Sequence, residues 1–198
     1  PMMVHRLIVA WQQLQVTGRN PGLMTPSYCC AETGAEGHYV VQLGPRYVAC
    51  TCASDEVRSV DATISSGSLI PLAVFDVVGP FDEGFFIDAI DTDWCLRARA
   101  AGYGIYAVGG AQLKHRLGDD YHRVQFLGRQ RRILLHSPLR SYTIARNNLA
   151  LAGRPHASAA WRRFVFAMLA QRLVCFITFG PKRWQHVKAL ARGVIDGL

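Results

Sequence analysis

The sequence predicts an α/β fold from three observations. Residues 1–14 follow the amphipathic pattern of a helix, and residues 17–22 interrupt it. Short β-prone pieces at 39–41 and 47–49 are separated by Gly and Pro, as strands are. Half of the chain, 50% of 198 residues, is apolar, which is enough to build a substantial core.

The region 66–115 concentrates acidic residues where a fold usually buries apolar ones. Carboxylates stand among large apolar side chains at Asp82, Glu83, Asp88, Asp91 and Asp93. We interpret residues 85–90 as a strand or extended loop, and residues 94–101 as a helix that ends with Gly102 in the C′ position. Carboxylates among large apolar side chains indicate a cleft that these acidic residues line.

Asp91 and Asp93 are expected at the N-terminus of that helix. The positive end of the helix dipole keeps a carboxylate ionised there, and the neighbouring acidic charges oppose this effect. A base poised in this way can take a proton from a bound hydroxyl group. The alternative is that Asp93 or Thr92 is simply an N-cap, which stabilises a helix by about 1 kcal/mol.

A series of motifs in a fixed order carries a family resemblance. The series is SGSLIP (66–71), VGPFDEGFFID (78–88), DTDWCLR (91–97), AGY (101–103), KH (114–115), SPLRSY (137–142), RN (146–147) and ARGVIDGL (191–198). It resembles the acceptor-side half of family 2 glycosyltransferases, and most of all the rhamnosyltransferases that build bacterial surface polysaccharides. The resemblance runs from about residue 64 to the last residue.

The resemblance implies roles for individual residues. Asp91 would be the catalytic base of an inverting single displacement, although Ile90 stands where many relatives have Glu. Asp93 would orient the acceptor or the base, with Trp94 beside it. Gly67 and Ser68 would belong to an acceptor-binding loop, although Gly67 also suits a turn that needs positive φ.

His115 matches the family histidine that completes a divalent metal site. It follows the apolar stretch 105–108 and an expected Gly-Gly turn at 109–110. Without the resemblance, a lone histidine is more often structural or on the surface. The metal, Mg²⁺ or Mn²⁺, also needs an Asp-x-Asp motif from the donor half of the family fold. The sequence has no Asp before Asp55, and residues 22–26 resemble the short strand that follows the donor metal motif in relatives. The chain is therefore expected to begin just past the donor half.

The fold implied by the resemblance is the C-terminal half of a GT-A type, Rossmann-like glycosyltransferase with a C-terminal helical extension. Residues 1–135 would form the acceptor-side part of the catalytic domain, and residues 136–198 a basic helical extension in contact with the membrane. Residues 29–60 are expected to form a loop-rich insertion over the acceptor cleft.

Charge is distributed unevenly along the chain. Residues 1–111 contain six Lys or Arg and eleven Asp or Glu, whereas residues 112–198 contain sixteen and three. This asymmetry predicts an anionic partner for the C-terminal part. Arg140 and Arg146 are candidate phosphate-binding residues, with a solvated basic face as the alternative. Nucleic acid is disfavoured, because the basic residues are not interleaved with an aromatic stacking platform.

The segment 161–179 is rich in large apolar residues, but its apolar stretch is shorter than the roughly twenty residues that a membrane span needs. Flanking basic residues and tryptophans suit a helix that lies on an anionic membrane surface, and a buried core helix is the alternative. The cysteine spacing does not match a zinc site, and the N-terminus shows no signal peptide. We therefore expect a cytoplasmic protein, peripheral on the inner face of the cytoplasmic membrane.

The expected function is transfer of a hexose, with rhamnose from dTDP-rhamnose favoured, to a lipid-linked or polysaccharide acceptor. The alternative is a non-catalytic module that binds an acceptor or a membrane and lacks the donor-binding half.

Overall fold

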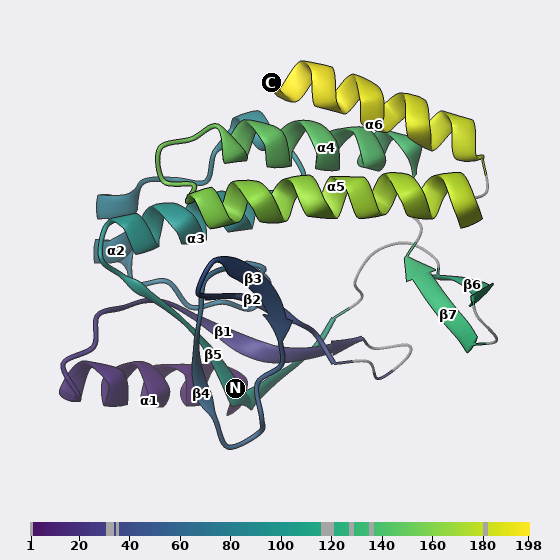
Figure 1. Ribbon diagram of the computed structural model, residues 1–198. Coiled ribbons are helices and arrows are strands. Elements are labelled where there is room, and N and C mark those ends of the chain that lie inside the picture. The colour runs from purple at the N-terminus through teal and green to yellow at the C-terminus, as the bar shows by residue number, and fades with distance from the viewer. Residues whose placement is uncertain are drawn as a thin grey trace. The chain divides into compact units, whose positions relative to one another are not determined.

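The computed structural model describes residues 2–30, 34, 36–115, 121–126, 129–134, 137–179 and 182–198. The elements follow in this order (Figure 1): α1 (Met2–Val16), β1 (Pro21–Cys30), β2 (Tyr39–Leu43), β3 (Arg46–Cys50), β4 (Val57–Val60), α2 (Leu72–Val78), a 3₁₀ turn (Glu83–Phe85), α3 (Ile90–Ala100), β5 (Gly104–His115), β6 (Tyr121–Phe126), β7 (Arg129–Leu134), α4 (Pro138–Ala152), α5 (Ala159–Phe179) and α6 (Arg183–Gly197). This mixture of helices and strands confirms the predicted α/β class.

The chain forms two compact units. Unit 1 comprises Pro1–Phe86 and Ile90–Arg116, and unit 2 comprises Ile87–Ala89 and Leu117–Leu198. Unit 2 therefore takes three residues from the middle of the sequence. The division into domains at residue 135 stays a prediction.

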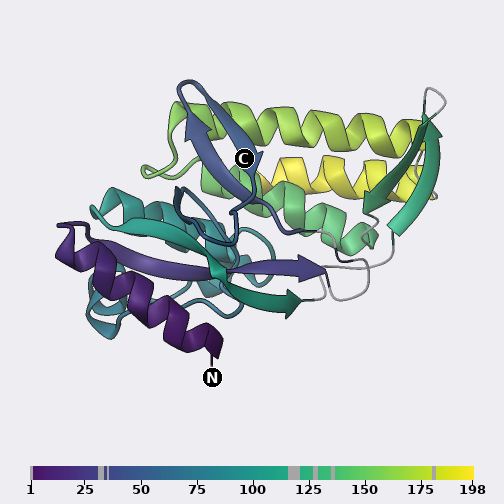
Figure 2. The same ribbon diagram turned by 90° about the horizontal axis from the view of Figure 1, so that it is seen from below.

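Unit 1 is built on a three-stranded sheet in the order β1-β5-β4. Strands β1 and β5 are parallel, and β4 is antiparallel to β5. The helix predicted for residues 1–14 is confirmed as α1, which lies along β1 and β5 in Figure 2. Leu7 and Ala10 of α1 pack with Met24, Tyr106 and Val108 of these two strands in one core. Burial of this apolar stripe fixes α1 to the sheet.

The Gly-Gly turn expected at 109–110 is wrong, because β5 continues through both glycines. Its register against β1 shifts there: Val108 lies opposite Pro26, and the next pair is Gln112 and Ser27. At Gly109 an added Cβ would lie 1.6 Å from the carbonyl oxygen of Ala53, so only glycine lets that loop approach the strand. Residues 29–60 are also more regular than predicted, since β2 and β3 form an antiparallel hairpin and β4 joins the main sheet.

The strand or extended loop expected at 85–90 is a sharp bend. Phe86, Asp88 and Ala89 have φ values of 56°, 63° and 63°, and α3 starts directly afterwards at Ile90. Such conformations are unfavourable for residues other than glycine and persist only where surrounding contacts hold them. The end of α3 is as predicted: Gly102 has φ 86°, and the Tyr103 N–H donates to the Ala98 carbonyl at 3.0 Å.

Unit 2 contains α4, α5, α6 and an antiparallel hairpin of β6 and β7. A buried polar contact ties the three helices together. The His186 Nδ1 of α6 lies 2.9 Å from the Ser141 Oγ of α4, and the His186 ring stacks on Phe176 of α5 with centroids 4.2 Å apart. Among the described residues, no helix is both long and apolar enough to cross a membrane.

We predict that Gly109→Ala lowers the free energy of unfolding by about 1–3 kcal/mol, the usual cost of overpacking. The added methyl group would collide with the Ala53 carbonyl, so the loop or the strand would have to shift. Urea unfolding measures the effect. Gly153→Ala is the matched control, because its Cβ would have no contact closer than 3.5 Å. Equal midpoints for the two variants would show that the loop is free to shift.

We also predict that acidification destabilises the helices through His186. Burial, and to a smaller degree the Lys182 charge, lowers the pKa of His186 below its ordinary value of 6.5. The folded chain then binds fewer protons than the unfolded chain, so the free energy of unfolding falls as pH drops from about 6.5 toward the folded pKa. This contribution is fully present above that range.

Urea midpoints measured across this pH range test the prediction. His186→Gln should remove part of the pH dependence, whereas His5→Gln on α1 should leave it unchanged. The same slope in all three proteins would contradict it.

Candidate functional site

Asp91 and Asp93 both lie in the first turn of α3, as the sequence predicts. The helix begins at Ile90, so neither Thr92 nor Asp93 occupies the N-cap position. The side chain of Asp91 is half-buried. In the part of the chain that the structure describes, no hydrogen bond or ion pair engages its carboxylate. Its oxygens are therefore available to accept a proton from a bound hydroxyl.

Asp93 has a different environment. Its side chain is fully buried and its Oδ2 lies 2.8 Å from the Arg97 Nε, one helical turn further on. Arg97 also donates to the carbonyls of Val78 at 2.6 Å and Pro80 at 2.8 Å. The Trp94 Nε1 donates to the carbonyl between them, that of Gly79, at 2.9 Å. Side chains of α3 thus bind three consecutive carbonyls where α2 ends.

Trp94 is the centre of an aromatic cluster. Its ring is fully buried, with centroids 6.3 Å from Phe75 and 5.9 Å from Phe81. The predicted acceptor-binding role of Asp93 and Trp94 therefore lacks an exposed surface in this structure. Both side chains hold the segment after α2 against α3, and acceptor binding by them stays a prediction.

Gly67 and Ser68 lie in a tight turn beside the sheet. Gly67 has φ 71°, and the Ser68 N–H donates to the Ser65 carbonyl at 2.9 Å. The Ser68 Oγ donates to the Ile64 carbonyl at 3.1 Å. A turn glycine is therefore enough to explain Gly67, and acceptor binding by this loop stays a prediction.

His115 is the last residue of β5, opposite Cys30 of β1. Its side chain lies outside the described part of the structure. Among the described residues, no three His, Cys, Asp or Glu side chains gather as a metal site. The described residues thus do not by themselves supply a complete set of metal ligands. Cys95 does not act as a thiolate, since burial raises its pKa to about 12.

Arg140, whose phosphate binding stays a prediction, contacts the carboxylate of Asp88 in unit 2 at 3.3 Å. Thr143 of α4 donates to the same carboxylate at 3.2 Å. The Asn147 amide donates to the Ile87 and Asp88 carbonyls at 2.6 and 3.3 Å. Side chains of α4 therefore contact both the backbone and the Asp88 carboxylate of the left-handed bend that precedes α3.

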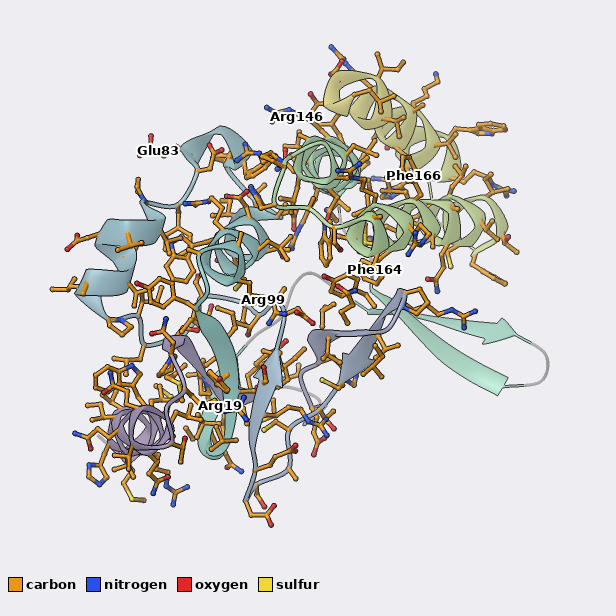
Figure 3. All side chains as sticks on the ribbon, turned by 60° about the vertical axis from the view of Figure 1, so that its left-hand side comes forward. Arg19, Glu83, Arg99, Arg146, Phe164 and Phe166 are labelled. Atoms are coloured by element: carbon orange, nitrogen blue, oxygen red, sulfur yellow. The ribbon has the colours of Figure 1, made fainter. Side chains whose placement is uncertain are left out.

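Arg172 extends this cluster from α5. It is half-buried on the stripe that also carries Leu169 and Phe176. Burial lowers its pKa, Asp88 opposes this effect, and the positive charge of Arg140 adds to it. The guanidinium groups of Arg140 and Arg172 therefore both interact electrostatically with the Asp88 carboxylate. Arg146, the other predicted phosphate ligand, lies further along α4 (Figure 3) and donates to the Asn147 side chain at 3.3 Å.

A polar pocket of about 410 Å³ lies in unit 1, between β1, β5 and the loop before β4. Its walls include Ser27, Gln112 and a Glu56–Arg58 ion pair of 2.8 Å. Burial, followed by the negative charge of Glu56, raises the pKa of the Cys52 thiol in this pocket. Carboxylate, guanidinium and amide groups together suit a hydroxyl-rich ligand. Asp91 is not one of the residues that line it.

Sequence reasoning missed these pocket residues and the roles of Asp88 and Arg172. The pocket comes from segments far apart in sequence, and no motif marks it. The signal for Arg172 was present: it interrupts the apolar run 164–179, at a position one turn from buried residues on either side.

Comparison with known proteins found one informative relative. The chain is 30% identical over 138 residues to the dTDP-rhamnosyl transferase RfbF of Shigella flexneri. The matched region is 69% of this chain and 45% of that protein, so the chain spans less than half of the relative's length. No protein-family profile matches the chain. No solved structure matches it either.

We predict that Asp93→Asn destabilises the protein by about 3–5 kcal/mol, because it removes one partner of a buried ion pair. Arg97 would keep its charge without the carboxylate that compensates it. Urea unfolding followed by tryptophan fluorescence measures the loss, since Trp94 lies beside the pair. Asp76→Asn, on the exposed side of α2, is the control and should cost less than about 0.5 kcal/mol. A stable Asp93→Asn protein would return Asp93 to the list of candidate acceptor ligands.

Proposed function

We propose that this chain is the acceptor-side part of a glycosyltransferase that moves rhamnose from dTDP-rhamnose to a sugar acceptor. The observation that carries the proposal is the 30% identity to a dTDP-rhamnosyl transferase over 138 residues. The family 2 motifs support the same function. Asp91 supports it too, as a half-buried carboxylate in the first turn of α3.

Asp91 acts as the general base in the proposed reaction. It takes the proton of the acceptor hydroxyl while that oxygen forms a bond to the anomeric carbon of rhamnose. The bond from this carbon to the diphosphate breaks, and dTDP leaves with the electron pair. Attack opposite the leaving group inverts the anomeric centre. Asp91 lies in the first turn of α3, where the helix dipole favours a negative charge.

The polar pocket of unit 1 is the proposed binding place for acceptor hydroxyl groups. Glu56 accepts hydrogen bonds, Arg58 donates them, and the Gln112 amide does both. Several residues of the segment 51–58, which belongs to the insertion expected over the acceptor cleft, form part of the pocket wall. A divalent metal at the diphosphate, with His115 among its ligands, stays a proposal for the enzyme that includes a donor half.

Residues 136–198 are the proposed contact with an anionic membrane surface, where a lipid-linked acceptor would be anchored. Large apolar side chains are exposed there, including Val174, Ile177, Trp184 and Ile195. Basic residues outnumber acidic ones in the same segment. Each Lys or Arg near an anionic surface contributes about 1 kcal/mol to binding.

A chimera tests the proposal. The matched region of the Shigella dTDP-rhamnosyl transferase is replaced by this chain, and transfer of radiolabelled rhamnose to acceptor is measured. We predict that the chimera transfers rhamnose and that Asp91→Asn lowers kcat by about 10²–10⁴-fold, the usual contribution of a general base. The thermal midpoint should stay within a few degrees, because no described contact depends on this carboxylate.

Asp76→Asn is the matched control and should keep full activity. Full activity of Asp91→Asn would remove the base from the proposal. A folded chimera that binds acceptor without transferring rhamnose would favour the non-catalytic alternative.

A further inference from the structure

An apolar groove lies between α5 and α6 in unit 2. Its walls include Phe166, Leu169 and Leu173 of α5, Val187 and Val194 of α6, and Leu149 of α4. The groove encloses about 330 Å³, and all of its described lining residues are apolar. Phe166 is 56% exposed, and Figure 3 shows it on the side of α5 next to α6, whereas Phe164 leaves the opposite side. An open apolar surface of this kind indicates a binding site.

The size of the groove favours a small ligand. Pockets for small molecules usually enclose about 300–1,000 Å³, so this groove lies at the lower end of that range. A stable protein partner buries about 1,000 Å² or more, which a groove of this size does not provide by itself. A narrow slot between two helices with apolar walls suits an extended hydrocarbon chain.

Arginines stand at both ends of the groove. Arg162 and Arg163 precede Phe166 by four and three residues, and Arg183 precedes Val187 by four. Residues at these spacings lie on the same helix face, so the arginines continue the groove by one turn. Figure 1 shows that α5 and α6 run side by side in opposite directions, which places the two groups of arginines at opposite ends. An anionic group at either end of a bound chain would meet a guanidinium.

Charge argues against a second copy of the chain as the occupant. The sequence from 159 to 198 contains seven basic residues and one acidic residue, Asp196. A symmetric contact through this face would bring the same basic residues of two copies together, at a cost in repulsion. The same excess of positive charge favours an anionic ligand.

We propose that the groove binds one hydrocarbon chain of an anionic amphiphile. The chain lies against the apolar walls, and the anionic head group contacts the arginines at one end. Binding is non-covalent and involves no step of sugar transfer, so the site stands apart from the function proposed for Asp91. The site would recognise an individual lipid by its chain and its charge together.

Calorimetric titration with dodecyl phosphate, kept below its micelle concentration, tests the proposal on the chain itself. We predict saturable binding of one molecule per chain. Dodecyl maltoside has the same hydrocarbon chain without the charge and should bind at least about tenfold more weakly, because it forgoes the arginine contacts. Inorganic phosphate lacks the hydrocarbon chain and should not compete.

Filling the groove gives the sharpest comparison. Ala170 and Ala191 line it, and Ala170→Phe or Ala191→Phe should each weaken dodecyl phosphate binding by at least about tenfold. Ala167→Phe is the matched control, because Ala167 is an exposed residue of the same helix that does not line the groove. A triple change of Arg162, Arg163 and Arg183 to Gln removes the charge without touching the walls and should also weaken binding.

Three results would overturn the proposal: no saturable binding, equal affinity in the filled and natural grooves, or equal affinity for the phosphate and the maltoside. A change of oligomeric state in the filled variants, measured by light scattering, would show that the groove is an interface between copies. Circular dichroism confirms folding, and the arginine variant decides the question if both filled variants unfold. Asp91→Asn should bind dodecyl phosphate like the natural chain, so loss of transfer and loss of lipid binding can be told apart.

Discussion

The buried ion pair of Asp93 and Arg97 is the interaction on which the candidate base depends. It fixes the Arg97 guanidinium so that it binds carbonyls on both sides of Gly79, while Trp94 binds Gly79 itself. These groups would otherwise be unsatisfied where α2 ends. Because the three donors all come from α3, the helix that carries Asp91 is locked to the preceding segment. A carboxylate in the first turn of a rigid helix has a defined direction.

Two carboxylates separated by one residue have opposite roles because of helix geometry. Positions two apart on an α-helix differ by about 200° around its axis, so one can face the core while the other does not. Asp93 is fully buried against Arg97, and Asp91 is half-buried with its oxygens available. The same two residues in an extended strand would have shared one face. The chemistry of this site therefore depends on where α3 begins.

The sequence was a good guide where a single element or a local signal decided the structure. The amphipathic helix at the N-terminus, the end of α3 at Gly102 and the acidic first turn of that helix follow from periodicity and capping. Contacts between residues far apart in the sequence could not be predicted from these local patterns. Gly109 and Gly110 were expected to turn the chain, but they sit within a strand because a loop some fifty residues earlier presses against it. The left-handed bend before α3 depends on Asn147, which lies sixty residues further on.

Asp88 and its neighbours also determine how unit 2 can assemble. The helices of this unit come from the last third of the chain, but the carboxylate that balances Arg140 and Arg172 comes from residue 88. During synthesis, residues 87–89 are made long before α4 and α5. They therefore have no helix to contact until those helices have been made. The last helices therefore gain part of their contacts from a segment made much earlier. A protein cut at residue 117 would lose the carboxylate that contacts Arg140 and the carbonyls that Asn147 binds, so this unit would be less stable as a module transferred to another protein.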